Sequence, residues 1–114
     1  MSDCIFCKIA SKSIPSKLIY EDDQIVAFDD LQPQAPVHSL VIPKRHVASV
    51  HELGEMDQPL LGRLLLICTT VAKLKGLIES GYRVVTNTGR DGGQTVFHLH
   101  FHVIGGRRMT WPPG

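Results

Sequence analysis

The stretch TVFHLHFHVIGG, residues 95–106, alternates histidine with apolar side chains and holds three of the six histidines in this chain of 114 residues. In a β-strand, successive side chains point to opposite faces. His98, His100 and His102 are therefore expected on one face. The other face would carry the apolar side chains Phe97, Leu99, Phe101 and Val103. The sequence thus predicts a half-buried strand that packs under a helix and presents a row of imidazoles on its open side.

Imidazole titrates near neutral pH and can act as a nucleophile, an acid or base, or a metal ligand. One histidine in this position would more often be a polar residue on the solvent side of a sheet. Three in strict alternation favour a functional site. A metal site made from all three is disfavoured, because ligands on one flat face do not converge on a tetrahedral ion with bonds of about 2 Å.

The glycine-rich loop before this strand, residues 88–94, suits an anion. Glycines such as Gly93 allow backbone N–H groups to approach a phosphate closely. Gln94 and Thr95 add side-chain donors, and Asn87 ends the preceding strand near the same place. Taken alone, this segment could be a plain hairpin loop. Beside the histidines, it predicts a phosphate site.

The rest of the chain supplies the other elements of an α+β fold. Residues 4–10 predict a short N-terminal helix that ends before Pro15. Strands are predicted at residues 37–43 and 82–87, and a pair of short strands within residues 17–30. With the histidine strand they make a five-stranded antiparallel sheet.

A long helix is predicted to begin at Asp57, with Pro59 in its first turn, and to end near Gly81. Apolar residues recur there every third or fourth position, which predicts one buried stripe. Its members are Leu61, Leu64, Leu65, Cys68, Val71, Ala72 and Leu74.

Composition limits the classes of protein. We expect one domain spanning residues 1–114, because 43% of the residues are hydrophobic and the length suits one core. A net charge of +1 argues against a nucleic-acid partner. No apolar run is long enough to span a membrane, and no signal peptide precedes the fold, so we expect a cytoplasmic protein without a membrane partner. Three cysteines are too few and too odd in number for a disulfide framework.

The string HLHFHVI, residues 98–104, resembles the His-x-His-x-His signature of the histidine triad (HIT) superfamily. Three longer segments resemble the histidine triad nucleotide-binding (HINT) branch: IPSKLIYEDDQIVAFDDLQPQAPVHSLVIPKRH, YRVVTNTGRDGGQTVFHLHFH and the ending GGRRMTWPPG. The Trp-Pro-Pro-Gly end is the most branch-specific of these. The resemblance covers nearly the whole chain and implies a HIT-like fold whose five-stranded sheets join across a homodimer.

The resemblance also implies an activity, the hydrolysis of purine nucleoside 5′-phosphoramidates such as adenosine monophosphate linked through nitrogen. His100 matches the nucleophile, which would attack the α-phosphorus and form a nucleotidyl-histidine that water then hydrolyses. His102 should donate to a phosphate oxygen. His98 completes the triad, and His38 matches a supporting histidine, although alone it could be a solvated edge residue.

Several positions match nucleotide contacts of the family. Asp30 matches an acidic residue that holds the ribose hydroxyls, and a carboxylate is a natural acceptor for a vicinal diol. Positions that contact the phosphate or leaving group are matched by Asn87, Gly93, Gln94 and Thr95. Ile19, Phe28 and Leu31 are expected to line the base pocket, although plain core residues are an equal alternative. Trp111 is expected near the site of the partner subunit.

Cys4 and Cys7 form a C-x-x-C motif, which alone is ambiguous among zinc, redox chemistry and chance. With His46 and His98 they would make a closed tetrahedral zinc set. Galactose-1-phosphate uridylyltransferases and some small bacterial HIT proteins resemble this arrangement. Many nucleotide-binding members lack the pair, so unligated packing of the two thiols is the alternative to structural zinc.

Two other functions use the same residues. One is a nucleotide-binding regulatory module with incidental turnover, and the other is a dinucleoside polyphosphate hydrolase, against which the tail argues. Zinc storage is the weakest interpretation, because the glycine-rich loop would then have no purpose.

Overall fold

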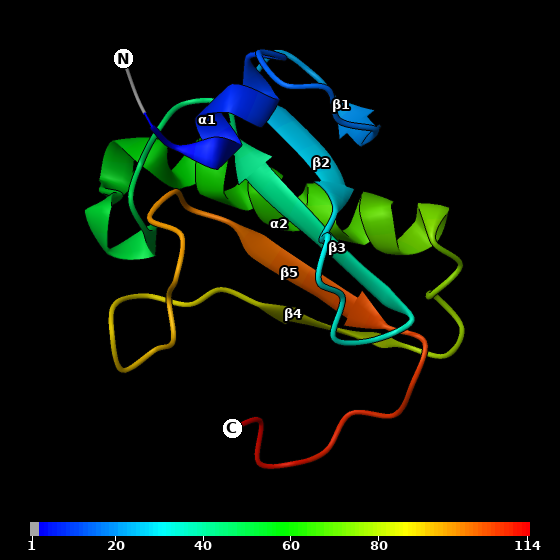
Figure 1. Cartoon of the computed structure of the whole chain (residues 1–114). Helices are drawn as coiled ribbons and strands as arrows, with labels where there is room; N and C mark the ends of the chain where they lie inside the picture. The colour runs from blue at the N-terminus through cyan, green and yellow to red at the C-terminus, as the bar shows by residue number, and fades with distance from the viewer. Residues whose placement is uncertain (1–2) are drawn as a thin grey trace.

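The computed structural model describes residues 3–114, which form five strands, two α-helices and two short 3-10 helices. Their order is α1 (Ile5–Ala10), β1 (Leu18–Glu21), β2 (Ile25–Asp29), β3 (Val37–Pro43), η1 (Val50–Glu52), η2 (Glu55–Asp57), α2 (Gln58–Leu74), β4 (Tyr82–Val85) and β5 (Phe101–Gly105) (Figure 1). All strand pairs are antiparallel, in the order β1-β2-β3-β5-β4. The predicted α+β class, with one long and one short N-terminal helix, is confirmed.

Strand β5 is inserted between β3 and β4, so the histidine segment enters the middle of the sheet. The register pairs His38 with Ile104 and Leu40 with His102. Directly paired residues share a face, and diagonal neighbours on that face lie close together. His38 and His102 are therefore brought side by side although 64 residues separate them in the chain.

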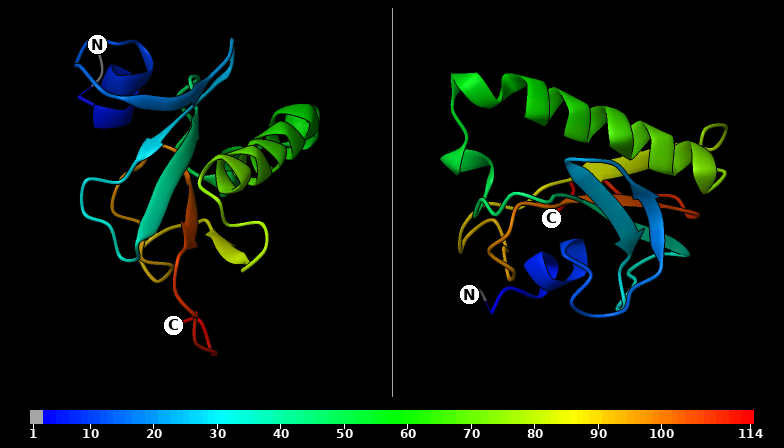
Figure 2. Two further views of the ribbon diagram at one scale, coloured as in Figure 1. Left: turned by 90° about the vertical axis from the view of Figure 1, so that its right-hand side faces the viewer. Right: turned by 90° about the horizontal axis from the view of Figure 1, so that it is seen from above.

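The two helices cover opposite faces of the sheet (Figure 2). We call the two buried layers the α2-side core and the α1-side core. The α2-side core comprises Ile25, Ala27, Val41, Val47, Leu64, Ile67, Cys68, Val71, Ala72, Leu77, Leu99, Phe101 and Val103. The α1-side core comprises Phe6, Ile9, Ala10, Val26, Phe28, Leu40 and Ile42. Because both faces are covered, β2 and β3 are almost continuously buried.

The histidine strand is shorter than the predicted 95–106, because β5 begins only at Phe101. Pairing with β3 reaches Val41 and stops two residues before its end at Pro43, which has no N–H to donate. Leu99 instead donates its N–H to Val47 O at 2.7 Å. Alternation still holds for Leu99 and Phe101, which enter the α2-side core, but Phe97 is 56% exposed, contrary to the prediction.

Helix α2 begins at Gln58, as predicted, but ends at Leu74 rather than near Gly81. Gly76 has a φ of +75° and Leu77 donates its N–H to Ala72 O at 2.9 Å, so Gly76 ends the helix in the left-handed conformation. The predicted stripe is buried at Leu64, Cys68, Val71 and Ala72, whereas Leu65 and Leu74 are exposed. No helix within residues 3–114 is both long enough and apolar enough to cross a bilayer.

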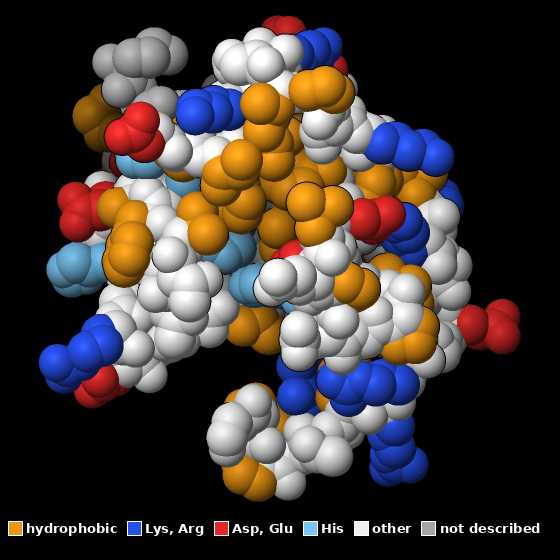
Figure 3. Space-filling model, viewed as in Figure 1, with side chains coloured by type: hydrophobic (Ala, Val, Ile, Leu, Met, Phe, Trp, Pro, Cys, Tyr) orange, Lys and Arg blue, Asp and Glu red, His pale blue; other side chains and the backbone are white. Residues whose placement is uncertain are grey.

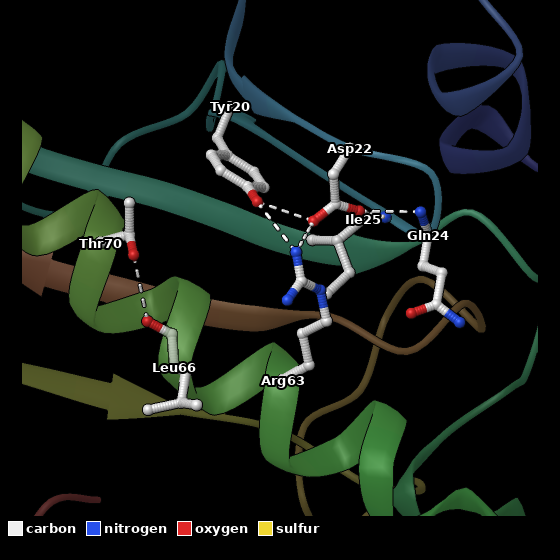
Figure 4. A network of polar contacts seen from close by, with 7 residues as sticks. All are labelled: Tyr20, Asp22, Gln24, Ile25, Arg63, Leu66 and Thr70. Carbon is white, nitrogen blue, oxygen red and sulfur yellow. Dashed lines mark hydrogen bonds and ion pairs between the residues drawn. The ribbon is translucent and has the colours of Figure 1, made fainter.

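A polar network ties α2 to the β1–β2 hairpin (Figure 4). Arg63 reaches from α2 to the Tyr20 hydroxyl at 3.2 Å and forms an ion pair with Asp22. Burial raises the pKa of Asp22, but hydrogen bonds from Tyr20, Arg63 and the main chain outweigh it, so that pKa lies well below its usual range. The network braces the sheet edge opposite to β4.

Candidate active site

His98, His100 and His102 lie on the α1 side of the sheet, as predicted, but that face is not open. Phe6 of α1 packs edge-on against the rings of His98 and His100, with centroid separations of 6.0 and 5.1 Å. His98 is 0% exposed and His100 is 6% exposed. The rings of His100 and His102 are 4.9 Å apart. The rings thus form a row beneath α1 whose end at His102 is partly accessible.

Main-chain groups decide which nitrogen of each ring can carry a hydrogen, because a carbonyl only accepts and an N–H only donates. His98 Nε2 lies 2.8 Å from Pro43 O and must donate to it. Its Nδ1 therefore keeps a lone pair. His100 Nδ1 lies 2.7 Å from His98 O and must donate likewise, which leaves the lone pair of His100 on Nε2.

The lone pair on His100 Nε2 can be reached from outside. Within residues 3–114, no buried side-chain nitrogen or oxygen is without a hydrogen-bond partner. This Nε2 makes no hydrogen bond in that part of the chain, so it lies at accessible surface. A largely buried ring with one accessible, unprotonated nitrogen is the arrangement that a nucleophile needs.

His38 and His102 form a second, directional pair. The N–H of Gln34 donates to His38 Nδ1 at 3.0 Å, which puts the hydrogen of neutral His38 on Nε2. His38 Nε2 lies 2.8 Å from His102 Nδ1 and donates to it. The hydrogen of His102 is consequently on Nε2, which can donate to a bound ligand beside the His100 nucleophile.

Burial keeps these rings neutral. It is the main cause that lowers the pKa values of His98, His100 and His102 below 6.5. For His102, repulsion by positive charge on His100 and His38 adds to the effect, and the pKa falls to about 4. At neutral pH the row of rings is therefore uncharged, which preserves the lone pair on His100 Nε2.

Asp30 lies next to this row, in the loop after β2. Its Oδ1 accepts the N–H of Gln32 at 2.8 Å, and its Oδ2 is 3.5 Å from His38 Nε2. The carboxylate is partly exposed. Both of its oxygens thus have a neighbour in the protein, and the side chain is still partly open to a ligand.

Cys4, Cys7, His46 and His98, which we call the Cys–His cluster, meet at the start of α1. Their four ligand atoms all lie within 4.8 Å of one another. His98 Nδ1 is 3.4 Å from Cys4 Sγ, 3.5 Å from Cys7 Sγ and 3.2 Å from His46 Nδ1. A tetrahedral zinc ion would separate two nitrogens by about 3.3 Å and a nitrogen from a sulfur by about 3.6 Å. The four donors therefore fit zinc in both chemistry and spacing.

The glycine-rich loop differs from the prediction at Gln94, which is buried and has its amide fully engaged. Its Oε1 accepts the N–H of Gly89 at 2.9 Å, and its Nε2 donates to Ala48 O at 2.6 Å and Val96 O at 3.1 Å. The side chain of Gln94 thus braces the loop and is not available to a phosphate, contrary to the prediction.

Other predicted donors in this loop remain accessible. Thr95 and Gly93 are exposed, and Gly93 has a φ of +80°. Asn87 donates to Gly92 O at 2.7 Å, which holds the loop closed. A side chain at Gly92 would meet Thr88 O at 2.4 Å, so the tight path of the loop requires glycine there.

A family model, the HIT domain, matches residues 11–109 of this chain. The chain belongs to the HIT domain family. An uncharacterized HIT-like protein of Synechococcus elongatus is 54% identical over 112 residues, which cover 98% of this chain and 97% of that protein. Two solved HIT structures give the same fold.

The crystal structure of a HIT family hydrolase from Legionella pneumophila has a TM-score of 0.95 at 48% identity, covering 98% of this chain and 100% of that one. The crystal structure of a histidine triad nucleotide-binding protein from Candida albicans has a TM-score of 0.80 at 37% identity, covering 89% of this chain and 73% of that one. The predicted resemblance to the HIT superfamily is confirmed.

This HIT domain has a second group of potential metal ligands, Asp30, His38 and His102. A metal on His38 Nε2 would force the hydrogen of that ring onto Nδ1, where the Gln34 N–H already points. Two N–H groups cannot face each other at hydrogen-bond distance. These three residues are therefore suited to hydrogen bonding, whereas the Cys–His cluster is suited to a metal.

Of the two alternatives left open for Ile19, base pocket or plain core, the structure favours the core. Strand β1 has an irregular register between Leu18 and Tyr20, and Ile19 packs against the α2-side core, away from the histidines. Leu18 packs on the α1 side instead and is paired with Phe28, which lies in the α1-side core. Leu31 is 96% exposed in the loop after β2.

Sequence reasoning missed three residues of the HIT site. Phe6 packs on two of the histidines, Thr86 donates to His100 O at 2.8 Å, and Gln34 orients His38 through its main chain. Of these three, only Phe6 could have been suspected from the sequence, because it lies between the two cysteines of the C-x-x-C motif. Trp111 is 82% exposed on the tail, which Arg83 anchors by donating to Thr110 O at 2.8 Å.

Proposed function

We propose that this HIT protein is a hydrolase that cleaves the P–N bond of purine nucleoside 5′-phosphoramidates. The observation that carries the proposal is the hydrogen bond from His100 Nδ1 to His98 O, which leaves an accessible lone pair on His100 Nε2. The related Legionella protein is named a hydrolase and the Candida protein a nucleotide-binding protein, which supports this class of chemistry.

In the first step, His100 Nε2 attacks the α-phosphorus and the P–N bond breaks, so that the amine leaves with a proton from water. The nucleotidyl-histidine ring carries a positive charge, which the carbonyl of His98 stabilises through Nδ1–H. In the second step, water attacks phosphorus and gives a proton to the hydroxide left by the first step, the electron pair of the bond between phosphorus and His100 returns to Nε2, and the nucleoside monophosphate is released. His102 Nε2–H donates to a phosphate oxygen throughout.

The remaining parts of the nucleotide have matching surroundings. Asp30 would accept hydrogen bonds from the ribose hydroxyls, and the exposed Thr95 and Gly93 would contact the phosphate. Figure 3 shows the histidines at the border of a hydrophobic area that extends toward α1. We propose that the purine lies on this area, near Phe28 and Leu31.

The variant His100→Ala tests the function. We expect its rate toward an adenosine 5′-phosphoramidate to fall on the order of a thousandfold or more, because no other lone pair is aimed at the phosphorus. Wild-type protein quenched during turnover should carry a nucleotidyl adduct that mass spectrometry maps to His100. Activity of His100→Ala at the wild-type rate would reject the proposal. Binding without any turnover by the wild type would favour a regulatory module instead.

We also propose that the Cys–His cluster binds one structural zinc ion. When bound, zinc would hold the ligands in one geometry and contribute to folding. The test is metal per chain after purification without a His tag, with about one zinc expected. Cys7→Ser should lose the metal. Cys68→Ser is the matched control and should keep it, because the Cys68 thiol lies in the α2-side core, where burial raises its pKa to about 12. Wild-type protein without zinc would contradict the proposal.

A homodimer that forms across β4 is proposed from the shape of the molecule. Strand β4 is an edge of the sheet, and the neighbouring α2 exposes Leu65, Leu66 and Leu74. An exposed edge beside exposed apolar side chains is typical of an interaction surface. Location in the cytoplasm is proposed because two thiolate ligands require a reducing compartment.

A further inference from the structure

We propose that the Cys–His cluster is a positioning device for the His100 nucleophile, beyond any role in stability. The proposal rests on the proposed function of His100. Two covalently separate routes lead from the cluster to this one ring. One runs through His98, whose carbonyl accepts His100 Nδ1–H, and the other through α1, whose Phe6 packs edge-on against the His100 ring.

The first route is the backbone of His98. Its ring is held at both nitrogens, by the other cluster members at Nδ1 and by Pro43 O at Nε2. A ring fixed at two points fixes its own main chain. The carbonyl of that same residue accepts His100 Nδ1–H at 2.7 Å. The cluster therefore sets the direction of the acceptor that orients the nucleophile.

This route matters because the sheet does not hold His100. Regular pairing begins only at Phe101, so His98 and His100 lie in the irregular segment before β5. The Leu99 N–H to Val47 O bond and the Thr86 hydroxyl on His100 O are contacts to this segment's main chain. Neither contact fixes the rotation of the His100 ring, which the carbonyl of His98 determines.

The second route is α1. Cys4 is its N-cap and accepts the N–H of Cys7 at 3.3 Å, so both sulfurs are built into the first turn. Phe6 lies between them in the chain and packs edge-on against His100, with an interplanar angle of 86°. Because the cluster fixes the position of α1, it also fixes the Phe6 ring that packs against the ring of His100.

The test compares His46→Ala with His51→Ala. His46 is an exposed cluster member, so its truncation removes no side chain from either buried core, and His51 is an exposed histidine outside the cluster. We expect His46→Ala to lower kcat at least tenfold with KM changed less than about twofold, which is the scale on which loss of a group that orients a functional side chain typically lowers activity, about 10–100-fold. His51→Ala should match the wild type in both constants.

A second readout does not depend on turnover. The Nδ1–H of His100 should give a slowly exchanging, downfield proton resonance, identified by its absence in His100→Gln. We expect this resonance to be lost or shifted in His46→Ala and in the double variant Cys4→Ser, Cys7→Ser, and to be retained in His51→Ala. Leu64→Ala should retain it while lowering stability, which separates positioning from a general loss of stability.

Wild-type kcat and an unchanged resonance in both cluster variants would overturn the proposal and leave the cluster as a structural element only. If the wild type does not hydrolyse the phosphoramidate, the proposed function fails, but the resonance still decides whether the cluster positions His100. The proposal is supported if either folded cluster variant loses both the wild-type kcat and the Nδ1–H resonance of His100 while His51→Ala keeps both.

Discussion

Main-chain atoms determine which nitrogen carries the hydrogen in each of His38, His98, His100 and His102. Pro43 O leaves His98 with a lone pair on Nδ1, toward the thiols, and His98 O leaves His100 with one on Nε2, toward the ligand. The Gln34 N–H donates to His38 Nδ1 and so leaves the hydrogen of that ring on Nε2, which donates to His102 Nδ1. The hydrogen of His102 is then on Nε2, which can donate to a ligand. Four identical side chains thus differ in which nitrogen keeps a lone pair, and this suits them to the separate roles proposed above for a metal ligand, a nucleophile, a relay and a hydrogen-bond donor.

The lowered pKa values of His100 and His102 predict the pH dependence of activity. His100 attacks only when neutral, and burial lowers its pKa below 6.5 as it does for His102, whose pKa is about 4. Activity is thus present above the folded-state pKa values and lost as the pH falls through them. We expect kcat/KM to stay level between pH 8 and the ordinary histidine pKa of 6.5, and to decline only below it. A pH–rate profile measures this, and an acid limb centred at or above 6.5 would contradict it.

Residue types and alternation predicted the shared face of the histidines and all four members of the Cys–His cluster. They could not predict the role of Gln94, because an amide beside a glycine loop can bind a ligand or brace the loop. The choice depends on carbonyls such as Ala48 O, 46 residues away in the chain. For Ile19 the resemblance left base pocket and plain core equally open, and the local irregularity in β1 that turns Ile19 toward the α2-side core is not visible in the sequence.

The strands and α-helices were predicted in type and order, but the two 3-10 helices and several element ends were not. Strand β5 begins late because its neighbour β3 ends at a proline, which is a property of the partner strand and invisible in the histidine segment itself. Helix α2 ends early because Gly76 takes the left-handed conformation, whereas Gly81, with a φ of +94°, lies in the connection to β4. The sequence alone does not show which of these two glycines ends the helix.

Substitution by alanine should have opposite effects on the free energy of unfolding at Gly62, inside α2, and at Gly76, just after its end. Gly62 is inside the helix and exposed, with nothing within 4 Å of an added Cβ, so Gly62→Ala should raise the free energy of unfolding by about 0.5–1 kcal/mol. Gly76 also has open space but a φ of +75°, so Gly76→Ala should lower it by about 1–2 kcal/mol. Denaturant titration measures both, and kcat should be unchanged. Equal effects of the two substitutions would contradict this account of the helix end.

The two sides of the sheet differ in composition: the α2 side holds most of the apolar core, and the α1 side holds the histidines and the Cys–His cluster. The long helix and the α2-side core bury most of the apolar side chains, and Arg63 joins that helix to the far edge of the sheet. The opposite layer is thinner, and there α1 covers the histidines and carries both cysteines. Polar groups that would be costly in a thick core are thus placed where a short helix can shield them and still leave Nε2 of His100 accessible.

The outer surface of α2 yields the last prediction, which concerns assembly. Leu66 is 69% exposed, and in a monomer an exposed Leu66→Glu substitution should change stability by no more than about 0.5 kcal/mol. If α2 and β4 pair with a second copy, the buried carboxylate has no partner and the dimer should dissociate. We expect light scattering to give a dimer for the wild type and a monomer for Leu66→Glu, with a melting temperature that depends on concentration only in the wild type. Met56→Glu, at a 94% exposed position on η2, is the control and should remain a dimer. A monomeric wild type would remove the proposed dimer, and the exposed leucines of α2 would then lack an explanation.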